Sequence, residues 1–410
     1  MTTVNLSGVV LAEIDGSVSA PDGFRSAGVA CGIKKNGSLD LALIVSDRPA
    51  SAAAVFTTNK AQAAPVLVSK ARLAASGGHA RAIVINSGCA NACTGPDGLE
   101  TAEAMADTAA RGAGAERNEV LVASTGVIGV ALDRRTVLDG IDSAFAALNH
   151  SGGAAAARAI MTTDPFPKEA AVEATTTAGR FRVGGVAKGS GMIEPLMATM
   201  LAVVTTDAQV APGVLQRALA AAADVTFNAI TVDGECSTND CVFALANGAS
   251  GVAIGERQFD LLVGALRHVC ETLAIGIVRG GEGATKLVTI DVTGARDDAE
   301  AKKAARAIGN SPLVKTAVHG ADPNWGRLVA VAGRAGVDFA LERARVQIGD
   351  VVLFADGRPF DERAPQASTH LQGADVSLLV DLGTRGSGRA RMWTCDLSAD
   401  YVKINAEYRT

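Results

Sequence analysis

Aromatic residues are scarce in this sequence. They make up 4% of the 410 positions, while hydrophobic residues as a whole make up 48%. The core must therefore be built from aliphatic side chains and from close backbone approach, for which 45 glycines are available. A chain of this length and hydrophobic content fills two ordinary domains or one large intertwined unit. The composition indicates a globular protein.

Other absences exclude classes of function. Residues 1–6 lack the charged and apolar regions of a secretion signal, and no apolar run approaches the ~20 residues of a membrane span. The formal net charge is −5 and the basic residues are scattered, which argues against nucleic acid as a partner. We expect a soluble, cytoplasmic protein with no membrane or nucleic-acid partner.

Cysteine and histidine patterns offer no metal site. The seven cysteines are too thinly spread for a disulfide framework, so reduced thiols are expected. Neither Cys89 and Cys93 nor Cys236 and Cys241 have the Cys-x-x-Cys spacing of a zinc site, and no His-Glu-x-x-His occurs. The Gly-x-Ser-x-Gly motif and the glycine-rich phosphate loops are also missing. We expect no metal.

Short apolar runs bounded by turn residues alternate irregularly with stretches of helical periodicity, which predicts an α/β fold with mixed sheets. The expected strands are 82–85, 120–123, 181–186, 199–205, 230–232, 241–246, 286–292, 328–331, 376–382 and 390–395. The expected helices are 100–113, 137–148, 213–223, 259–275 and 299–308. Residues 175–182 with their flanking strands predict a hairpin.

The junction between Ala198 and Thr199 is the most informative point of the chain. A polar loop loosened by glycines, which begins at Lys188, precedes an apolar strand that begins at Thr199. Taken alone, Thr199 is an ordinary β-branched residue that opens a core strand. If it were freed as an N-terminus, it would carry both a hydroxyl nucleophile and an α-amine of pKa about 7.7 to 8 that can act as the base.

Further motifs resemble the signatures of one family, in that family's order, from near Phe24 to the C-terminus. They are Asn86-Ser-Gly-Cys-Ala-Asn-Ala-Cys-Thr-Gly95, Ser124-Thr-Gly-Val-Ile-Gly129, Met161-Thr-Thr-Asp164, Ser237-Thr-Asn-Asp240, Gly281-Glu-Gly-Ala284 and Asp322-Pro-Asn-Trp-Gly-Arg327. Together with the junction loop they resemble the ornithine acetyltransferases, also called bifunctional glutamate N-acetyltransferases. Several blocks in one order are far more specific than any single short motif.

The resemblance implies an enzyme of arginine biosynthesis that cuts itself between Ala198 and Thr199. Chains 1–198 and 199–410 would stay folded together in a helix-sheet-sheet-helix arrangement with a smaller lobe, as a tetramer of the two chain types. Acetyl would pass from N2-acetyl-L-ornithine to Thr199 and then to L-glutamate, a ping-pong mechanism without a cofactor. Whether acetyl-CoA is also a donor is left open.

The resemblance also assigns roles to individual residues. Thr199 is the nucleophile, Thr125 and Gly126 form the oxyanion hole, Lys188 holds a carboxylate and Glu282 holds an ammonium group. The remaining substrate-binding positions are Thr162 or Thr163, Asn405 and Thr410. Each has an ordinary alternative on its own: Ser124-Thr-Gly is a common turn, and a loop lysine or acid is usually solvated. The family usually has a serine after the asparagine where this chain has Ala406, so the tail contacts are less well specified.

Several other positions match the family without a clear role. Asn86 and Asn91 are weak candidates for lining the pocket. The Asp322-to-Arg327 segment is rich in turn residues, so a structural role is at least as well supported as a catalytic one. His319 is interpreted as a packing residue. Glu194 receives no role.

Three alternatives stay open. The first is an N-terminal-nucleophile amidase or aminopeptidase of similar architecture, which would release acetate without glutamate. The second is a paralogue of the acetyltransferase in specialised metabolism. The third is an uncleaved small-molecule binding protein, which a denaturing gel would reveal as a single intact band.

Overall fold

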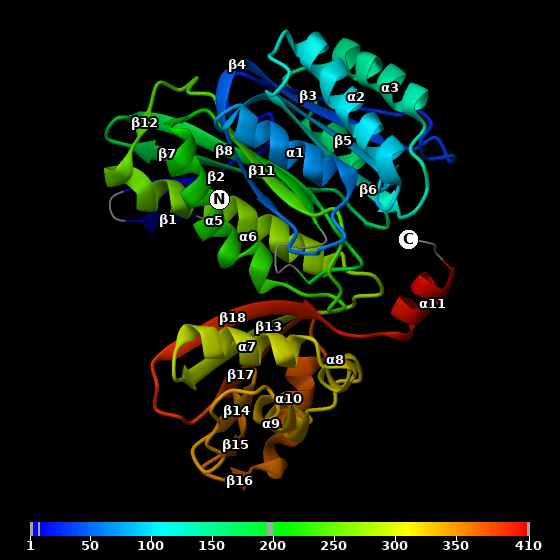
Figure 1. The fold of residues 1–410 in the computed structure, drawn as a ribbon. Helices are drawn as coiled ribbons and strands as arrows, with labels where there is room; N and C mark the ends of the chain where they lie inside the picture. The colour runs from blue at the N-terminus through cyan, green and yellow to red at the C-terminus, as the bar shows by residue number, and fades with distance from the viewer. Residues whose placement is uncertain (1–2, 7–8, 195–199, 408–410) are drawn as a thin grey trace. The chain divides into compact units, whose positions relative to one another are not determined.

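The computed structural model describes residues 3–6, 9–194 and 200–407, and the chain folds into two compact units (Figure 1). The larger unit contains the described residues up to 228 together with 236–277. The smaller unit contains residues 229–235 and those from 278 onward. Both combine helices with mixed sheets, so the predicted α/β class is confirmed.

A ten-stranded sheet forms the larger unit. Its strand order is β1-β2-β7-β8-β9-β11-β4-β5-β6, with β3 paired to β4. The strands are β1 (Thr3–Leu6), β2 (Val9–Glu13), β3 (Phe24–Val29), β4 (Leu41–Phe56), β5 (His79–Cys89), β6 (Val120–Val127), β7 (Lys168–Thr176), β8 (Gly179–Lys188), β9 (Leu201–Thr206) and β11 (Cys241–Ala246). Strand β9 runs parallel to β11 and antiparallel to β8, so it lies inside the sheet with hydrogen-bonded neighbours on both sides. A short parallel pair, β10 (Gln209–Val210) and β12 (Ala253–Ile254), accompanies the sheet.

Helices cover the two ends of this sheet on their outer faces, as Figure 1 shows. Helices α1 (Ala64–Ala75), α2 (Gly95–Ala113) and α3 (Arg134–Ala147) pack their buried residues on β3 to β6. The opposite faces of β5, β6, β8, β9 and β11 share a second core, which also contains α4 (Gly153–Ala159). The arrangement is the expected helix-sheet-sheet-helix layering.

Helix α6 (Phe259–Arg279) packs on β7 and β8, and α5 (Pro212–Asp224) borders β4 through hydrogen bonds between Gln216 and Ala54. A Cβ atom at Gly185 of β8 would lie 3.0 Å from the side chains of Val269 and Leu273, so the glycine permits the close approach of α6. The segment 256–279, which contains α6, is the one described helix long and apolar enough to cross a membrane. Half of its apolar window is buried inside the structure.

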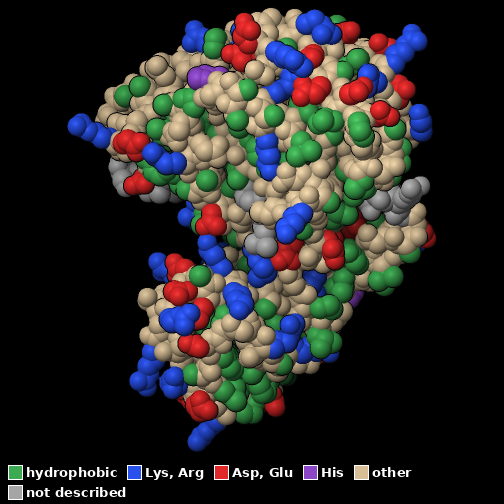
Figure 2. All heavy atoms as spheres, viewed as in Figure 1, with side chains coloured by type: hydrophobic (Ala, Val, Ile, Leu, Met, Phe, Trp, Pro, Cys, Tyr) green, Lys and Arg blue, Asp and Glu red, His purple; other side chains and the backbone are tan. Residues whose placement is uncertain are grey.

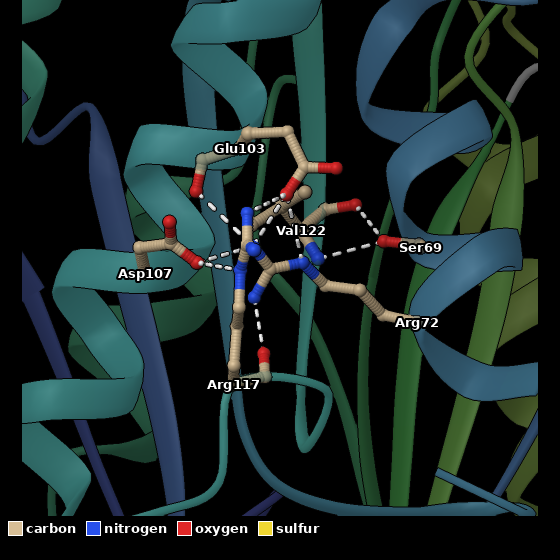
Figure 3. A network of polar contacts seen from close by, with 6 residues as sticks. All are labelled: Ser69, Arg72, Glu103, Asp107, Arg117 and Val122. Carbon is tan, nitrogen blue, oxygen red and sulfur yellow. Dashed lines mark hydrogen bonds and ion pairs between the residues drawn. The ribbon is translucent and has the colours of Figure 1, made fainter. Parts of the chain in front are cut away.

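Four charged residues tie α1 and α2 to the start of β6 (Figure 3). Arg72 of α1 is 2% exposed and pairs with Glu103 and Asp107 of α2, at 2.5 Å in each case. Its guanidinium also donates to the backbone carbonyl of Arg117, whose own side chain pairs with Asp107. The network therefore fixes the two helices to the turn that leads into β6, the strand that carries Thr125.

The smaller unit is built on a six-stranded sheet of order β16-β15-β14-β17-β13-β18. Its strands are β13 (Leu287–Ala295), β14 (Arg345–Ile348), β15 (Val351–Ala355), β16 (Arg358–Pro359), β17 (Asp375–Asp381) and β18 (Gly388–Cys395). Its helices are α7 (Asp298–Gly309), α8 (Pro312–His319), α9 (Trp325–Gly333), α10 (Ala364–Leu371) and α11 (Ala399–Glu407). One apolar core, built around Ile290, Ala304 and Leu378, joins the sheet to α7, α8, α9 and α10.

Most predicted elements are confirmed, including the hairpin of β7 and β8, but two strands are wrong. Residues 328–331 lie within helix α9, because Asn324 caps that helix by accepting from the Arg327 amide. Residues 230–232 form no strand and make only an isolated bridge, at Ile230 with Trp393.

Charged side chains of both signs are interspersed over the face seen in Figure 2, in keeping with the low net charge.

Candidate active site

In the larger unit, Lys188 brings two predicted site residues together. It is the last residue of β8 and is 6% exposed. Its ammonium donates to Oγ1 of Thr162 at 2.8 Å and to Oγ1 of Thr125 at 3.2 Å. Thr163 lies half-buried in the same turn as Thr162, but the contact with Lys188 is made by Thr162. Three segments remote in sequence thus meet at one cation.

A carboxylate that the sequence analysis overlooked organises this cation. Asp164 accepts from the backbone amides of Thr162 at 2.9 Å and Gly189 at 2.7 Å, and it pairs with the buried ammonium of Lys168. Burial alone would raise the pKa of Asp164, but the charges of Lys188 and Lys168 outweigh it and lower the pKa to about 2. Asp164 is therefore ionised and fixes the residue after Lys188. It lies in the quoted Met161-Thr-Thr-Asp164 block, four positions before its partner lysine, and that spacing was the available signal.

Lys34 adds a further cation near this cluster. Its ammonium donates to the backbone carbonyls of Leu39 at 2.8 Å and Met161 at 2.7 Å. Burial lowers the pKa of Lys34, and the charge of Lys188 acts in the same direction. Lys34, Lys168 and Lys188 therefore lie near Asp164, and Asp40 is a second carboxylate beside Lys34. Three cations against these two carboxylates suit a ligand that carries a carboxylate.

Thr125 and Gly126 lie near the end of β6, where the backbone comes very close to β5. Gly126 has φ +128°, and a Cβ there would lie 2.4 Å from the carbonyl carbon of Gly88. Only glycine fits this position. Because Thr125 accepts its hydrogen bond from Lys188, the hydroxyl hydrogen remains available for a second acceptor. The geometry can therefore present a hydroxyl donor beside a closely packed backbone turn.

A buried network of hydrogen bonds supports the turn at Thr125 and Gly126. Ser124 donates to Oδ1 of Asn86 at 2.6 Å, and Asn86 donates to the carbonyl of Cys89 at 2.9 Å. Asn239 donates to the carbonyls of Ser124 at 2.9 Å and Ala90 at 2.6 Å. Asn86 therefore contributes to the support of Thr125. Asn239 was not assigned a role from the sequence, because its partners are too remote for any local pattern to indicate.

Asn91, the other weak candidate for lining the pocket, forms hydrogen bonds with nearby residues at the start of α2. Its side-chain amide donates to the carbonyl of Gly98 at 2.9 Å, and its Oδ1 accepts from Thr94 at 2.7 Å. Its φ of +47° is left-handed, a conformation in which asparagine is tolerated. Asn91 thus shapes the entry into α2.

In the smaller unit, Glu282 and Asn405 meet each other. Glu282 is 6% exposed in the turn after α6, and Oε2 accepts from the side-chain amide of Asn405 in α11 at 2.8 Å. Asn405 also donates to the carbonyl of Tyr401 one turn earlier at 3.0 Å. The contact brings the end of the chain to the carboxylate expected to hold an ammonium group. Ala198, Thr199 and Thr410 lie outside the described residues.

The Asp322-to-Arg327 segment has a structural role in the same unit. Trp325 stacks on Phe354 at 5.1 Å between ring centroids and donates to Asp361 at 2.9 Å. Arg327 donates to the carbonyl of Leu313 at 2.6 Å and so joins α9 to α8. These contacts account for the motif as packing and turn chemistry.

His319, also in this unit, is tied to a buried carboxylate. It forms a 2.7 Å contact with Asp396, which also accepts two hydrogen bonds from Thr285 and one from the Lys286 amide. Burial raises the pKa of Asp396, but these partners outweigh it and lower the pKa below its ordinary value. The His319 side chain itself is exposed, so it binds the buried carboxylate from the surface and is not a packing residue of the core, contrary to the interpretation from the sequence.

Comparisons with known proteins place this geometry in context. The model of the ArgJ family matches residues 25–410. An arginine biosynthesis bifunctional protein ArgJ of a Synechococcus species is 49% identical over 97% of this chain and 98% of the relative. The protein of the same name from Chlorobaculum tepidum is 47% identical over 98% of this chain and 99% of its own length.

Two solved structures are similar to parts of the chain. The ArgJ protein of Bacillus halodurans is 41% identical, and the match covers 50% of this chain and 97% of that one, with a TM-score of 0.47. The ornithine acetyltransferase of Mycobacterium tuberculosis, solved with ornithine, is also 41% identical. That match covers 45% of this chain and 98% of the other, with a TM-score of 0.42.

Proposed function

The chain belongs to the ArgJ family, and from this membership we propose that it transfers acetyl from N2-acetyl-L-ornithine to L-glutamate in arginine biosynthesis. The observation that carries the proposal is the family match across residues 25–410, with relatives of known name that align over nearly their whole length. The chain is accordingly an acyltransferase. The cluster at Lys188 supplies side chains that suit amino-acid substrates.

We propose that the mature enzyme arises by cleavage between Ala198 and Thr199. The Thr199 hydroxyl attacks the Ala198 carbonyl, and water then hydrolyses the ester. The two chains are expected to stay together without a disulfide, because β9 from the second chain is hydrogen-bonded to β8 of the first, and β11 to β4. All seven cysteines are free thiols in the structure.

In turnover, the freed α-amine of Thr199 takes the proton of its own hydroxyl, which attacks the acetyl carbonyl of the donor. Ornithine leaves, and glutamate then accepts the acetyl group from Thr199. The tetrahedral intermediates carry an oxyanion, for which we propose the Thr125 hydroxyl and the Gly126 amide as donors. The unused hydroxyl hydrogen of Thr125 and the closely packed backbone of Gly126 support this assignment.

For substrate recognition, we propose that Lys188 holds the carboxylate, with Thr162 or Thr163 beside it. Glu282 and Asn405 would hold the ammonium end, together with the terminal Thr410. The surplus of cations around Asp164 supports the first assignment. The buried carboxylate of Glu282 supports the second.

The experiment that tests the function is a direct product analysis. Purified protein incubated with N2-acetylornithine and glutamate should form ornithine and N-acetylglutamate in equal amounts, and without glutamate the turnover should stop after one acetyl group per Thr199. Steady release of acetate in the absence of glutamate would instead identify an amidase, the class that family membership disfavours. Complementation of an arginine auxotroph separates a biosynthetic enzyme from a paralogue in specialised metabolism.

Two finer properties belong to the same proposal. Replacing N2-acetylornithine with acetyl-CoA in the assay decides whether the enzyme accepts a second acetyl donor, as the word bifunctional in the names of its relatives suggests. We propose that no cofactor is required, so dialysed protein should keep its full activity. We also propose a tetramer of the two chain types, which light scattering of the purified protein will test.

A further inference from the structure

Asn239 is a buried side chain that binds the backbone on both sides of the proposed oxyanion turn. It belongs to the Ser237-Thr-Asn-Asp240 block, which the proposed reaction does not use, and it is 4% exposed. Its side-chain amide donates to the carbonyl of Ala90, directly after β5, at 2.6 Å and to the carbonyl of Ser124 in β6 at 2.9 Å. The two hydrogens of one amide group therefore connect two strands.

The pairing of β5 with β6 is irregular where this amide group connects them. The parallel register is regular up to the pair of Gly88 and Gly126 and then shifts at Cys89. Such a shift marks a β-bulge, which locally disrupts the ladder of backbone hydrogen bonds. Among the described strands, β6 is the last in its sheet and pairs with β5 alone. The hydrogen bonds from Asn239 therefore support β6 at the point where its ladder is irregular.

The other contacts of Asn239 fix the orientation of the amide group. Its Oδ1 accepts from the Thr238 hydroxyl at 2.6 Å, and its backbone amide donates to Oγ of Ser237 at 3.2 Å. This loop is anchored in turn, because the Thr238 carbonyl accepts from the Ala63 amide at 2.9 Å. The Ser237 carbonyl accepts from the Thr57 hydroxyl at 2.8 Å. Because Oδ1 is bonded to a donor, the side-chain nitrogen faces the two carbonyls, which bond only to donors.

The hydrogen bond to the Ser124 carbonyl bears directly on Thr125. A peptide group is planar, so the Ser124 carbonyl and the Thr125 nitrogen share one rigid plane. Holding this carbonyl fixes the plane from which the Thr125 side chain projects. The donors of an oxyanion hole act because they are already in place, and a misplacement of about 1 Å can lower a rate about 10²-fold. The amide group of Asn239 is therefore placed to control how well Thr125 meets an oxyanion.

We propose that Asn239 is a positioning residue of the oxyanion hole, which holds the peptide between Ser124 and Thr125 so that the Thr125 hydroxyl meets the oxyanion. This inference rests on the proposed function, in which Thr125 is an oxyanion donor. Asn239 acts through Thr125 and contacts neither substrate nor the reacting atoms. Its loss should therefore weaken the stabilisation of the transition state and leave the binding of the substrates unchanged.

The variant that tests this role is Asn239→Ala, which takes the shared donor away from the carbonyls of Ala90 and Ser124. The assay uses N2-acetylornithine and glutamate, and kcat is expressed per cleaved chain. We expect kcat to fall by at least about 10-fold with KM within about twofold of the parent, because only the transition state loses a well-placed donor. Wild-type kinetics, or a raised KM with an unchanged kcat, would overturn the proposal.

A double-mutant cycle with Thr125→Ala shows whether Asn239 acts through Thr125. If it does, adding Asn239→Ala to Thr125→Ala should lower kcat further by about threefold at most, because the donor that Asn239 positions is already absent. A change that only loosens the fold would lower kcat by the same factor in both backgrounds, as independent changes do. Equal factors would therefore contradict the proposed role.

The matched control is Ser69→Ala, which also removes a buried side chain that binds the backbone of β6 (Figure 3). Ser69 in α1 is fully buried, and its hydroxyl donates to the carbonyl of Val122 and accepts from the amide of the same residue, at 2.7 Å in each case. Val122 lies three positions before Thr125, so Ser69→Ala should leave kcat and KM unchanged. If it lowers kcat as much as Asn239→Ala does, any loosening of β6 suffices and the specific role of Asn239 is refuted.

A second variant serves if Asn239→Ala does not fold. Thr238→Val has nearly the same shape as the parent and removes the donor to Oδ1 of Asn239, while both amide hydrogens remain. It should lower kcat without changing KM, and an unchanged kcat counts against the proposal. If too little protein matures for kinetics, the same cycle is measured on the rate of self-cleavage, because the acyl shift passes through a similar oxyanion.

The results also separate this inference from the proposed function. If Thr125→Ala keeps the kcat of the parent, or if the wild-type protein transfers no acetyl group, the proposed function fails and this inference falls with it. A slow Thr125→Ala together with a normal Asn239→Ala rejects only the role of Asn239.

Discussion

The ammonium of Lys188 and the hydroxyl of Thr125 lie 3.2 Å apart, although the two residues are separated by 63 positions in the sequence. Lys188 also contacts Thr162, and the next residue, Gly189, is held by the buried carboxylate of Asp164. The proposed substrate-binding cation and the proposed oxyanion donor therefore share one hydrogen bond. A change at either residue is expected to affect both binding and catalysis, and the predictions below separate the two.

We predict that Thr199→Ala leaves a soluble single chain of 41.5 kDa with no transferase activity, because the only nucleophile is removed. Thr199→Ser should retain slow cleavage and some turnover, since serine keeps the hydroxyl and can be freed as an amine. The larger wild-type fragment should begin with Thr-Met-Leu-Ala by N-terminal sequencing.

The control for this series is Thr206→Ala, at the other end of β9, where the hydroxyl donates to the Arg182 carbonyl at 2.7 Å and accepts from the Ala208 amide at 3.2 Å. It should cleave normally if it folds. Turnover by folded Thr199→Ala would rule out the covalent mechanism.

Thr125→Ala should lower kcat by about 10²-fold or more with little change in KM, because an oxyanion donor acts more strongly in the transition state than in the bound substrate. Thr125→Ser keeps the hydroxyl and should recover most of the rate. Cleavage of Thr125→Ala should also be slow, since the acyl shift passes through a similar oxyanion. An unchanged kcat with a raised KM would show that Thr125 binds substrate and that the oxyanion donors lie elsewhere.

Asp164 should make the stability of the fold depend on pH in the acidic range. Its carboxyl group has a pKa of about 2 in the folded protein against an ordinary value of 3.8, so the stabilisation is present above pH ~4 and is lost as the pH falls towards 2. At about 1.36 kcal/mol for each pKa unit, the contribution is about 2 kcal/mol. The free energy of unfolding of Asp164→Asn should therefore lie at least this far below that of the parent at neutral pH.

This comparison is best made in the Thr199→Ala background, where the chain stays intact, and the difference should shrink as the pH falls. Asp139→Asn is the control, because Asp139 is exposed and pairs only with exposed Arg135. A stability difference for Asp164→Asn that does not change with pH would contradict the assignment.

Arg72→Met should destabilise the larger unit by roughly 1 to 3 kcal/mol, because it removes the hydrogen bonds of a buried guanidinium, while the partly exposed carboxylates of Glu103 and Asp107 keep Arg117 as a partner. Arg134→Met, which breaks the exposed pair with Glu100, should cost less than ~1 kcal/mol. Urea unfolding of both variants in the intact-chain background measures the contrast. Equal effects would mean that the network in Figure 3 adds little beyond surface pairing.

Helices and strands with a clear periodic spacing of apolar residues were predictable from the sequence. Strand β11 was predicted with the observed bounds, and helices such as α3 and α5 within a few residues, because apolar spacing and helix-starting residues agree there. The run from Leu328 to Val331 was wrongly predicted as a strand, because four apolar residues suit a strand and a helix equally well. The cap at Asn324, four positions earlier, was the signal that decides for the helix.

Site residues were predictable only as far as the family motifs name them. The contact between Lys188 and Thr162 joins two such motifs, whereas the bond from Asn239 to the Ser124 carbonyl joins residues 115 positions apart through a backbone atom. Backbone carbonyls carry no sequence signal, so this support could not be predicted.

The position of β9 inside the ten-stranded sheet has a consequence for the lifetime of the mature enzyme. If the chain is cut ahead of this strand as proposed, unfolding releases two polypeptides, and refolding becomes a bimolecular reaction. The uncut chain can refold by itself, whereas the refolding of the cut protein slows as it is diluted, and the two chains are lost to each other once they diffuse apart. The durability of the mature enzyme is therefore set by the rate at which the sheet opens and not by an equilibrium between folded and unfolded forms.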